Sequence, residues 1–279
     1  MFPVSVDSAA RILLQQAVQV PLPLAEEQHV EFLNALMTGG PISAPVKSEA
    51  DARTQLLKIY PKDFVEHVSN LDIGDELRAF SLVDANERAF FSDWFSIRDF
   101  KEGGYARINE ALRRPDAIPA ELRPVIAHLV RSLMHLAMFQ DAMFVEDIVY
   151  RGEIRNGADI AHLDEGEIYV ANAFMSAFDD EEDVTALLAD QAPLLPGEIR
   201  VQYEIERTTA LAGPRITDLL RDGGAEVVFL PGTKFVVTGV ERNSGQQATL
   251  IKLRTLGIEL ATWQDRLTSL VTSGSLAST

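Results

Sequence analysis

The chain has no cysteine among its 279 residues. Disulfide frameworks, thiolate metal sites and cysteine nucleophiles are therefore excluded. Positive charge is also scarce, because 25 Lys and Arg residues stand against 42 Asp and Glu residues, which gives a formal net charge of −17. A chain this acidic, without a visible cluster of Lys and Arg, is repelled by phosphate backbones, so no nucleic-acid partner is expected.

Long apolar runs are absent as well. No stretch approaches the roughly 20 apolar residues that a membrane-spanning helix needs, so no membrane segment is expected. The first residues, MFPVSVD, have no basic segment followed by an apolar stretch, which a secretory signal peptide would show. If the protein leaves its cell, we expect a specialised secretion machine or a larger parent chain to carry it; otherwise it is cytoplasmic.

The residues that are present, 47% of them hydrophobic, suffice for a sizeable core. Apolar residues at three- and four-residue spacing predict helices at 8–18, 25–37, 48–59, 62–69, from 85, from 105, and at 120–144. After Asp147 the pattern changes and predicts strands at 148–151, 168–171, 199–205, 227–230, 234–240 and 249–253. Helices followed by strands favour an α+β fold, a helical N-terminal part before a mainly antiparallel β-sandwich.

Three segments with one polar residue inside a strand-like apolar run stand out. They are VYRGE at 149–153, FMSAF at 174–178 and AEVVFLPGTKF at 225–235, and the polar residues are Arg151, Ser176 and Glu226. Each residue alone is common on a half-buried strand, where polar and apolar side chains alternate. Together and in this order they suggest a site that grips an anionic group and stabilises a cation.

With these segments the chain from about Ser81 to about Glu259 resembles the mono-ADP-ribosyltransferases of the Arg-Ser-Glu type, the C2- and cholera-toxin-like bacterial toxins and effectors. The segment YARINEALR at 105–113 is similar to the helix that precedes the core in that family. The resemblance divides the chain into a helical accessory region at 1–77, a catalytic core at 78–262 and a flexible tail at 263–279.

The resemblance implies cleavage of NAD between nicotinamide and ribose, with transfer of ADP-ribose to a target protein and without a metal. Glu226 would stabilise the positive charge that develops on the ribose, as carboxylates do at glycosidic centres. Arg151 would bind the phosphates or the ribose through its planar fork of donors, and Ser176 would orient Glu226 and NAD. The cofactor-binding set implied in this way is Arg151, Gly152, Ser176, Tyr105 and Phe178.

The sequence departs from the family pattern beside Glu226. Gly224 stands where many members have Glu or Gln, a position that guides the acceptor; Asp222 lies two residues earlier in the same loop. Ala177 and Phe178 replace hydroxyl residues that usually follow the serine. Two alternatives therefore remain open: an NAD glycohydrolase, with water as the acceptor, and a catalytically degenerate ADP-ribosyltransferase-like binding module. The net negative charge points to a target with a basic surface, reached in the cytosol of a target cell.

Two further groups of ionisable residues have plainer interpretations. The acidic run at 179–183 lacks the alternate-position spacing of a calcium loop, so we expect a solvated acidic loop. His128 and His135 are seven residues apart on the long predicted helix and hence on one face, where we expect packing or surface roles.

Overall fold

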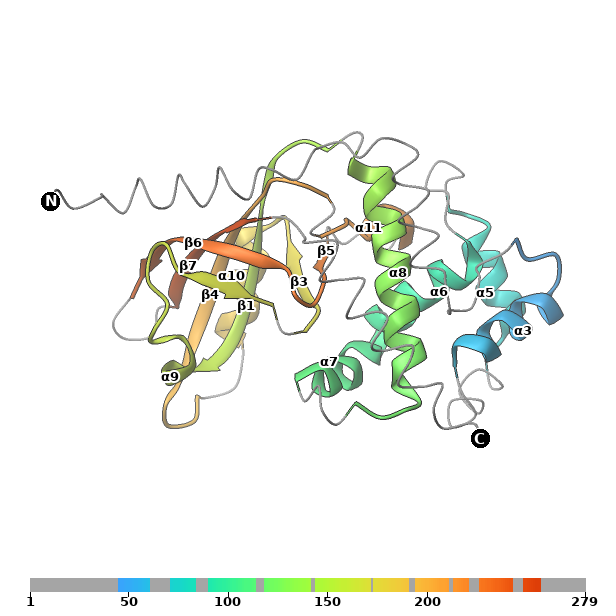
Figure 1. Ribbon diagram of the computed structural model, residues 1–279, viewed down its shortest axis with the longest axis horizontal. Coiled ribbons are helices and arrows are strands. Elements are labelled where there is room, and N and C mark those ends of the chain that lie inside the picture. The colour runs from blue at the N-terminus through green and yellow to red at the C-terminus, as the bar shows by residue number, and fades with distance from the viewer. Residues whose placement is uncertain are drawn as a thin grey trace, which may run out of the picture.

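The computed structural model describes residues 45–60, 71–83, 90–113, 118–141, 144–171, 173–190, 194–210, 213–220, 226–242 and 248–256. The helices predicted at 8–18, 25–37 and 62–69, and the predicted tail at 263–279, lie outside these ranges. Figure 1 shows the arrangement of the rest: the strands lie to one side, α3, α5 and α6 lie to the other, and α8 runs between these two groups.

Six helical elements precede the first strand in the described residues: α3 (Glu49–Ile59), α5 (Ile73–Phe80), α6 (Phe91–Asp99), the π-helical turn η3 (Phe100–Gly104), α7 (Tyr105–Arg113) and α8 (Leu122–Asp141). The helices predicted at 48–59 and 120–144 are confirmed as α3 and α8. The hydroxyl of Ser48 accepts the Asp51 N–H at 3.2 Å and so caps α3.

The glycine pair at 103–104 does not separate two helices, as its sequence suggests, but lies within the π-helical turn that joins α6 to α7. Gly103 has non-helical backbone angles inside that turn. A Cβ at Gly104 would lie 2.9 Å from the Asp99 carbonyl oxygen, which is too close for any other residue. The glycines therefore permit a widened turn, and such turns often lie at functional sites.

The six predicted strands are all present: β1 (Asp147–Asn156), β2 (Ile168–Val170), β4 (Glu198–Arg207), β5 (Glu226–Phe229), β6 (Lys234–Glu241) and β7 (Thr249–Thr255). With β3 (Met175–Phe178), which carries Ser176, they form one sheet in the order β2-β6-β7-β4-β1-β3-β5. All neighbouring pairs are antiparallel except the parallel pair of β4 and β7. The mainly antiparallel α+β fold is confirmed. The sandwich stays a prediction, because the described strands are hydrogen-bonded in a single sheet.

Three short helices interrupt the strands: α9 (Gly157–Ile160), α10 (Glu181–Asp190) and α11 (Thr217–Leu220). The acidic run at 179–183 is therefore not the solvated loop we expect from the sequence, because it opens α10. The Asp180 carboxylate accepts the Glu182 N–H at 2.7 Å. Carboxylates are favoured there because the N-terminal turn of a helix exposes unpaired N–H groups.

Two hydrophobic clusters hold the fold together. One cluster covers the inner face of the sheet and contains side chains from β1, β3, β4, β5, β6 and β7. Because these strands span nearly the whole sheet, the sheet has to curl for their side chains to meet in one cluster. The other joins α3, α5, α6, α7 and α8 to Val228 of β5 and to Phe174 and Leu230, which flank β3 and β5. Buried residues of α3, such as Leu56, belong to this second cluster, so the helices on both sides of residue 77 share one core. The domain boundary there remains a prediction.

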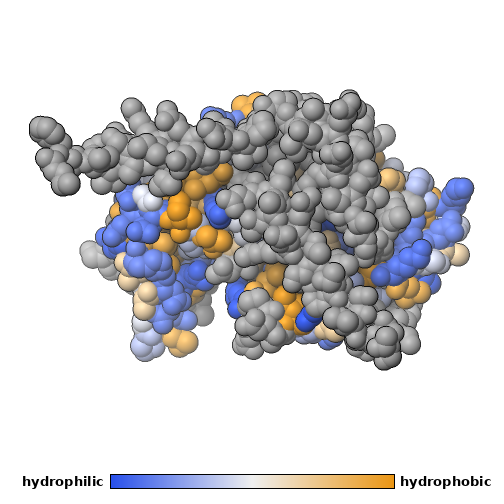
Figure 2. All heavy atoms as spheres, viewed as in Figure 1, coloured by the Kyte–Doolittle hydropathy of each residue, from blue (hydrophilic) through white to orange (hydrophobic). Residues whose placement is uncertain are grey.

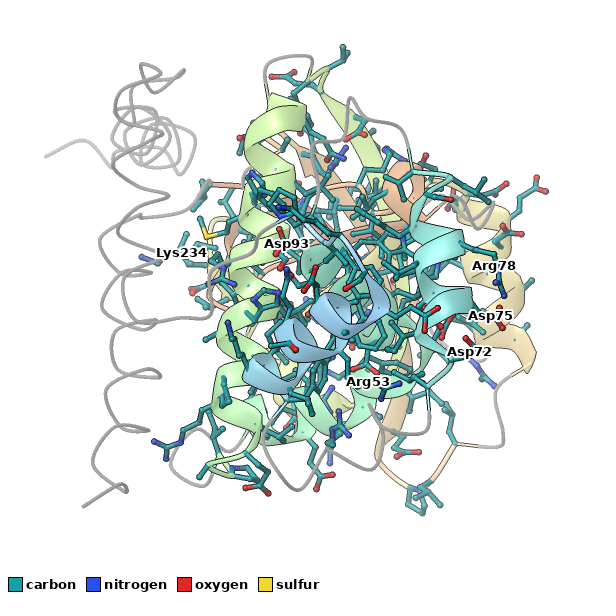
Figure 3. All side chains as sticks on the ribbon, turned by 90° about the vertical axis from the view of Figure 1, so that its right-hand side faces the viewer. Arg53, Asp72, Asp75, Arg78, Asp93 and Lys234 are labelled. Atoms are coloured by element: carbon teal, nitrogen blue, oxygen red, sulfur yellow. The ribbon has the colours of Figure 1, made fainter. Side chains whose placement is uncertain are left out.

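The outer surface of the helical end is charged. Figure 3 views this end and shows Arg78, Asp75 and Asp72 along α5, with Arg53 on α3, while Asp93 lies inside near α8. On the face drawn in Figure 2, hydrophilic residues lie at both ends of the described surface, with hydrophobic residues between them. No helix in the described ranges has the length and apolar character needed to cross a membrane.

Candidate functional site

Arg151 lies on β1 with its side chain on the face that contributes Val149 to the sheet core, because side chains alternate along a strand. The same alternation places Glu153 and Arg155 on that face. Arg151 Nη1 donates to the backbone carbonyl of Ser176 at 2.8 Å, and Arg151 Nη2 donates to Glu153 Oε2 at 3.0 Å. Arg151 is thus bound to β3, the strand that carries Ser176, but it contacts the backbone of Ser176 and not the hydroxyl group.

Glu153 is the centre of a polar group on this face. Its Oε1 accepts from the Tyr203 hydroxyl at 2.9 Å and lies 3.2 Å from Arg155 Nε. Burial of the Glu153 carboxyl opposes ionisation, but the guanidinium groups of Arg151 and Arg155 outweigh it, so the pKa of Glu153 lies below its usual range. Burial, aided by Tyr169 and Glu153, raises the pKa of Tyr203, whose hydroxyl therefore stays a hydrogen-bond donor.

A pocket of about 330 Å³ is lined by Arg151, Glu153, Arg155 and Tyr169 together with other residues. Arg113 of α7 joins Arg151 and Arg155 in its wall, so three guanidinium groups face two carboxylates, Glu153 and Asp159. The pocket also contains Tyr169, Phe174 and Met175, which supply apolar surface. A net positive, partly apolar cavity in a protein of charge −17 is suited to an anionic organic ligand.

Ser176 lies on β3, with its neighbours Met175 and Ala177 in the core of the sheet. Its own side chain therefore lies on the opposite face, where the register places it across from Val228. Asn109 of α7 fixes the start of this strand, because its side-chain amide donates to the Phe174 carbonyl and accepts the Phe174 N–H, both at 3.0 Å.

Glu226 is the first residue of β5, across from Phe178, and its residue exposure is 5%. Its Oε2 lies 3.1 Å from the Nζ of Lys101 in the π-helical turn, and its N–H donates to the Thr217 hydroxyl at 2.6 Å. Strands β1, β3 and β5 are adjacent, so the fold brings the three segments together. Among the residues that the structure describes, the pocket lining includes Arg151 and neither Ser176 nor Glu226.

The other predicted site residues lie in varied places. Gly152 faces α10, where a Cβ would lie 2.7 Å from Leu188 Cγ, so the glycine permits close packing. Tyr105 opens α7 and is 54% exposed, and Phe178 is half-buried; neither lines the pocket. Asp222 and Gly224 lie outside the described residues.

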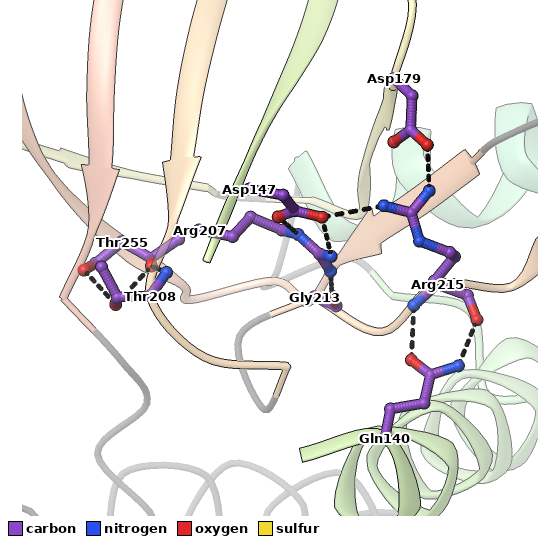
Figure 4. A network of polar contacts seen from close by, with 8 residues as sticks. All are labelled: Gln140, Asp147, Asp179, Arg207, Thr208, Gly213, Arg215 and Thr255. Carbon is purple, nitrogen blue, oxygen red and sulfur yellow. Dashed lines mark hydrogen bonds and ion pairs between the residues drawn. The ribbon is translucent and has the colours of Figure 1, made fainter. Parts of the chain in front are cut away.

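An ion-pair network holds the segment at 213–215, ahead of Glu226 in the chain (Figure 4). Arg215 donates to Asp147 at 2.8 Å and pairs with Asp179, while Gln140 of α8 binds both backbone groups of Arg215. Buried Arg207 donates to both oxygens of Asp147 at 2.6 Å and to the Gly213 carbonyl at 2.6 Å. The network ties β1, β4 and α8 to the residues just before Glu226.

The two histidines of α8 converge on Asp93 of α6, away from the pocket. His128 is buried with its Nε2 3.3 Å from Asp93 Oδ1, and His135 Nδ1 lies 3.6 Å from Asp93 Oδ2. The Ser132 hydroxyl donates to Asp93 at 3.0 Å. Burial lowers the pKa of His128 to about 4 despite Asp93, so the imidazole is neutral at pH 7. The expected packing role agrees with this placement.

Sequence reasoning missed Arg113, Glu153, Arg155 and Lys101. Glu153 and Arg155 could have been predicted, because they follow Arg151 at the spacing of two that keeps side chains on one face of a strand. Arg113 ends the segment at 105–113 that we singled out for another reason. Lys101 had no such signal, since its approach to Glu226 spans 125 residues of sequence.

Comparison with known proteins shows similarity of fold. No protein-family model matches the chain. No curated protein matches it either. Among solved structures, an N-terminally truncated form of the type III effector XopAI from Xanthomonas axonopodis pv. citri has a TM-score of 0.53 at 16% identity, covering 82% of this chain and 96% of its own.

Exoenzyme S from Pseudomonas aeruginosa, in complex with human 14-3-3 protein beta and bound to carba-NAD, has a TM-score of 0.51 at 12% identity, covering 75% of this chain and 88% of its own. The Vis toxin, an ADP-ribosyltransferase from Vibrio splendidus, matches at 27% identity over 77% of this chain and 89% of its own, with a TM-score of 0.48. At these identities the likeness to XopAI and Exoenzyme S concerns the fold alone.

Proposed function

We propose that this protein is a mono-ADP-ribosyltransferase of the Arg-Ser-Glu type that uses NAD as its substrate and modifies a target protein. The observation that carries the proposal is the adjacency of β1, β3 and β5, which bear Arg151, Ser176 and Glu226, in a fold shared with a protein that binds carba-NAD. The proposal extends to a toxin or effector that acts in a target cell after specialised secretion.

The Arg151 pocket supports NAD as the ligand. The diphosphate of NAD is anionic, and Arg113, Arg151 and Arg155 offer it charge-assisted hydrogen bonds. The Nε of Arg151 is buried and has no hydrogen-bond partner among the described residues, which leaves donor capacity in this guanidinium group. Tyr169 and Phe174 supply flat apolar surface for a ring of the dinucleotide.

Glu226 would carry the chemistry. The carbon–nitrogen bond between ribose and nicotinamide breaks with its electron pair moving to the nicotinamide nitrogen, which leaves as a neutral molecule. Positive charge develops on the ribose, and a carboxylate beside it stabilises that charge. A nucleophile of the target protein then bonds to the same ribose carbon and loses its proton. The ribose of a nucleotide bound at Arg151 has to extend from the pocket to Glu226, because Glu226 is not among the residues that line the pocket.

The proposal is tested with labelled NAD and a lysate of candidate target cells. We expect a labelled protein band with the natural protein and none with Glu226→Gln. Free ADP-ribose without a band would instead assign an NAD glycohydrolase, with water as the acceptor. Tight NAD binding without nicotinamide release would assign a degenerate binding module. Identification of the modified band would also show whether the target has the basic surface that the net charge predicts.

A further inference from the structure

Lys101 forms a partly buried ion pair with Glu226. Lys101 lies in the π-helical turn between α6 and α7, and its Nζ is 3.1 Å from Glu226 Oε2. The two side chains are 26% and 7% exposed, so the contact is mostly shielded from solvent. A shielded pair of this kind keeps its geometry better than an exposed one.

The turn that carries Lys101 is anchored to the site from both of its ends. Phe100 packs on Phe174, with ring centroids 5.1 Å apart, just before the strand of Ser176. Asn109, on the helix that continues the turn, binds both backbone groups of Phe174. The Tyr60 hydroxyl donates to Asp99 at 3.2 Å, immediately before the turn. The π-helical turn therefore holds the ammonium group of Lys101 next to Glu226, and the same segment contacts the residue that precedes β3.

We propose that Lys101 is a positioning residue for Glu226, an inference that rests on the proposed function. Lys101 binds Oε2, and Oε1 has no ion-pair partner among the described residues. A carboxylate with one oxygen held presents the other in a defined direction, which is what stabilisation of a developing positive charge requires. Without the ammonium group, the carboxylate in this largely buried position would lose its ion-pair partner and would turn toward solvent.

The test compares Lys101→Met with Lys101→Arg and with a matched control, Lys252→Met. Lys252 forms a 3.4 Å ion pair with Glu241 on the sheet, and neither residue belongs to the pocket. Nicotinamide release from NAD gives kcat and KM, and quenching of intrinsic tryptophan fluorescence gives the NAD dissociation constant. Thermal unfolding verifies that each variant is folded.

We expect Lys101→Met to lower kcat about tenfold or more, while KM and the dissociation constant change less than about threefold. Lys101→Arg should recover most of kcat, because a guanidinium can hold the same oxygen, and Lys252→Met should match the natural protein. A kcat of Lys101→Met within twofold of the natural value overturns the proposal. So does an increase in kcat, or a loss of NAD affinity that accounts for the whole defect.

The outcomes also separate this proposal from the proposed function. If the natural protein releases no nicotinamide, both fail together. If it releases nicotinamide and Lys101→Met does so equally well, only the role of Lys101 is overturned.

Discussion

The surroundings of Arg151 and Glu226 differ in kind, although their strands are separated only by β3. Arg151 faces a pocket of about 330 Å³ with other arginines, and its side chain is 20% exposed. Glu226 is buried beside Lys101, against the helical part of the molecule. The comparison suggests a division of labour: the Arg151 side is open and suited to binding a ligand, while the Glu226 side is enclosed and suited to chemistry on the ligand.

We expect the largest loss of activity from a change at Glu226. Replacing Glu226 with Gln keeps the volume and removes the charge, so nicotinamide release should fall by about 10²–10³-fold or more, the usual cost of losing a group that stabilises transition-state charge. NAD binding, measured by fluorescence quenching, should change little. If Glu226→Gln lost NAD affinity in the same proportion, Glu226 would act in binding NAD, and the two sites would not differ in role.

Arg151→Lys should have the converse effect. Lysine keeps the charge but loses the planar fork that reaches the Ser176 carbonyl and Glu153 together. We expect NAD affinity to fall about 10- to 100-fold, in line with roughly 1.5–3 kcal/mol for a hydrogen bond to a charged group. Isothermal titration with NAD measures it. Arg254→Lys, which weakens an ion pair with Glu206 elsewhere on the sheet, is the matched control.

The helical part can be tested through His128. Because burial lowers the pKa of His128 from 6.5 to about 4, the unfolded chain takes up this proton at higher pH than the folded protein. The free energy of unfolding is therefore highest above pH 6.5 and decreases as the pH falls toward 4. At pH 5 the loss amounts to about 2 kcal/mol. Urea unfolding at pH 7 and pH 5 should show this loss, and His128→Gln should flatten it. An unchanged slope in the variant would assign the pH dependence to other groups.

Only a small effect on NAD affinity is expected from a change at Gly152. A methyl group at this position meets Leu188 and Val184 of α10, so Gly152→Ala should destabilise the fold by about 1–3 kcal/mol, the usual cost of overpacking. NAD affinity should stay within about twofold of the natural value once the variant is folded. A larger loss would restore the contact with NAD that the family resemblance implies. Gly239→Ala, where the nearest atom is 3.7 Å away, controls for backbone effects.

Much of the local structure could be predicted from the sequence. All six predicted strands formed, because runs of Val, Ile, Phe and Tyr between Gly and Pro favour strands. The acidic run at 179–183 was misassigned because its charge suggested solvation, although an Asp before Glu, Glu and Asp is also typical of a helix start. The π-helical turn at 100–104 was missed, since a glycine pair reads locally as a break.

By itself, the sequence determined the order of helices and strands, the alternation that places Arg151, Glu153 and Arg155 on one face, and the resemblance that suggests NAD chemistry. These properties depend on neighbours within a few positions, which local propensity and side-chain alternation govern. The position of β3 between β1 and β5, the place of Arg113 in the pocket wall and the contact of Lys101 with Glu226 depend on tertiary packing. Those contacts join residues far apart in the chain, and they form because burying the two hydrophobic clusters brings α7, the π-helical turn and the strands together.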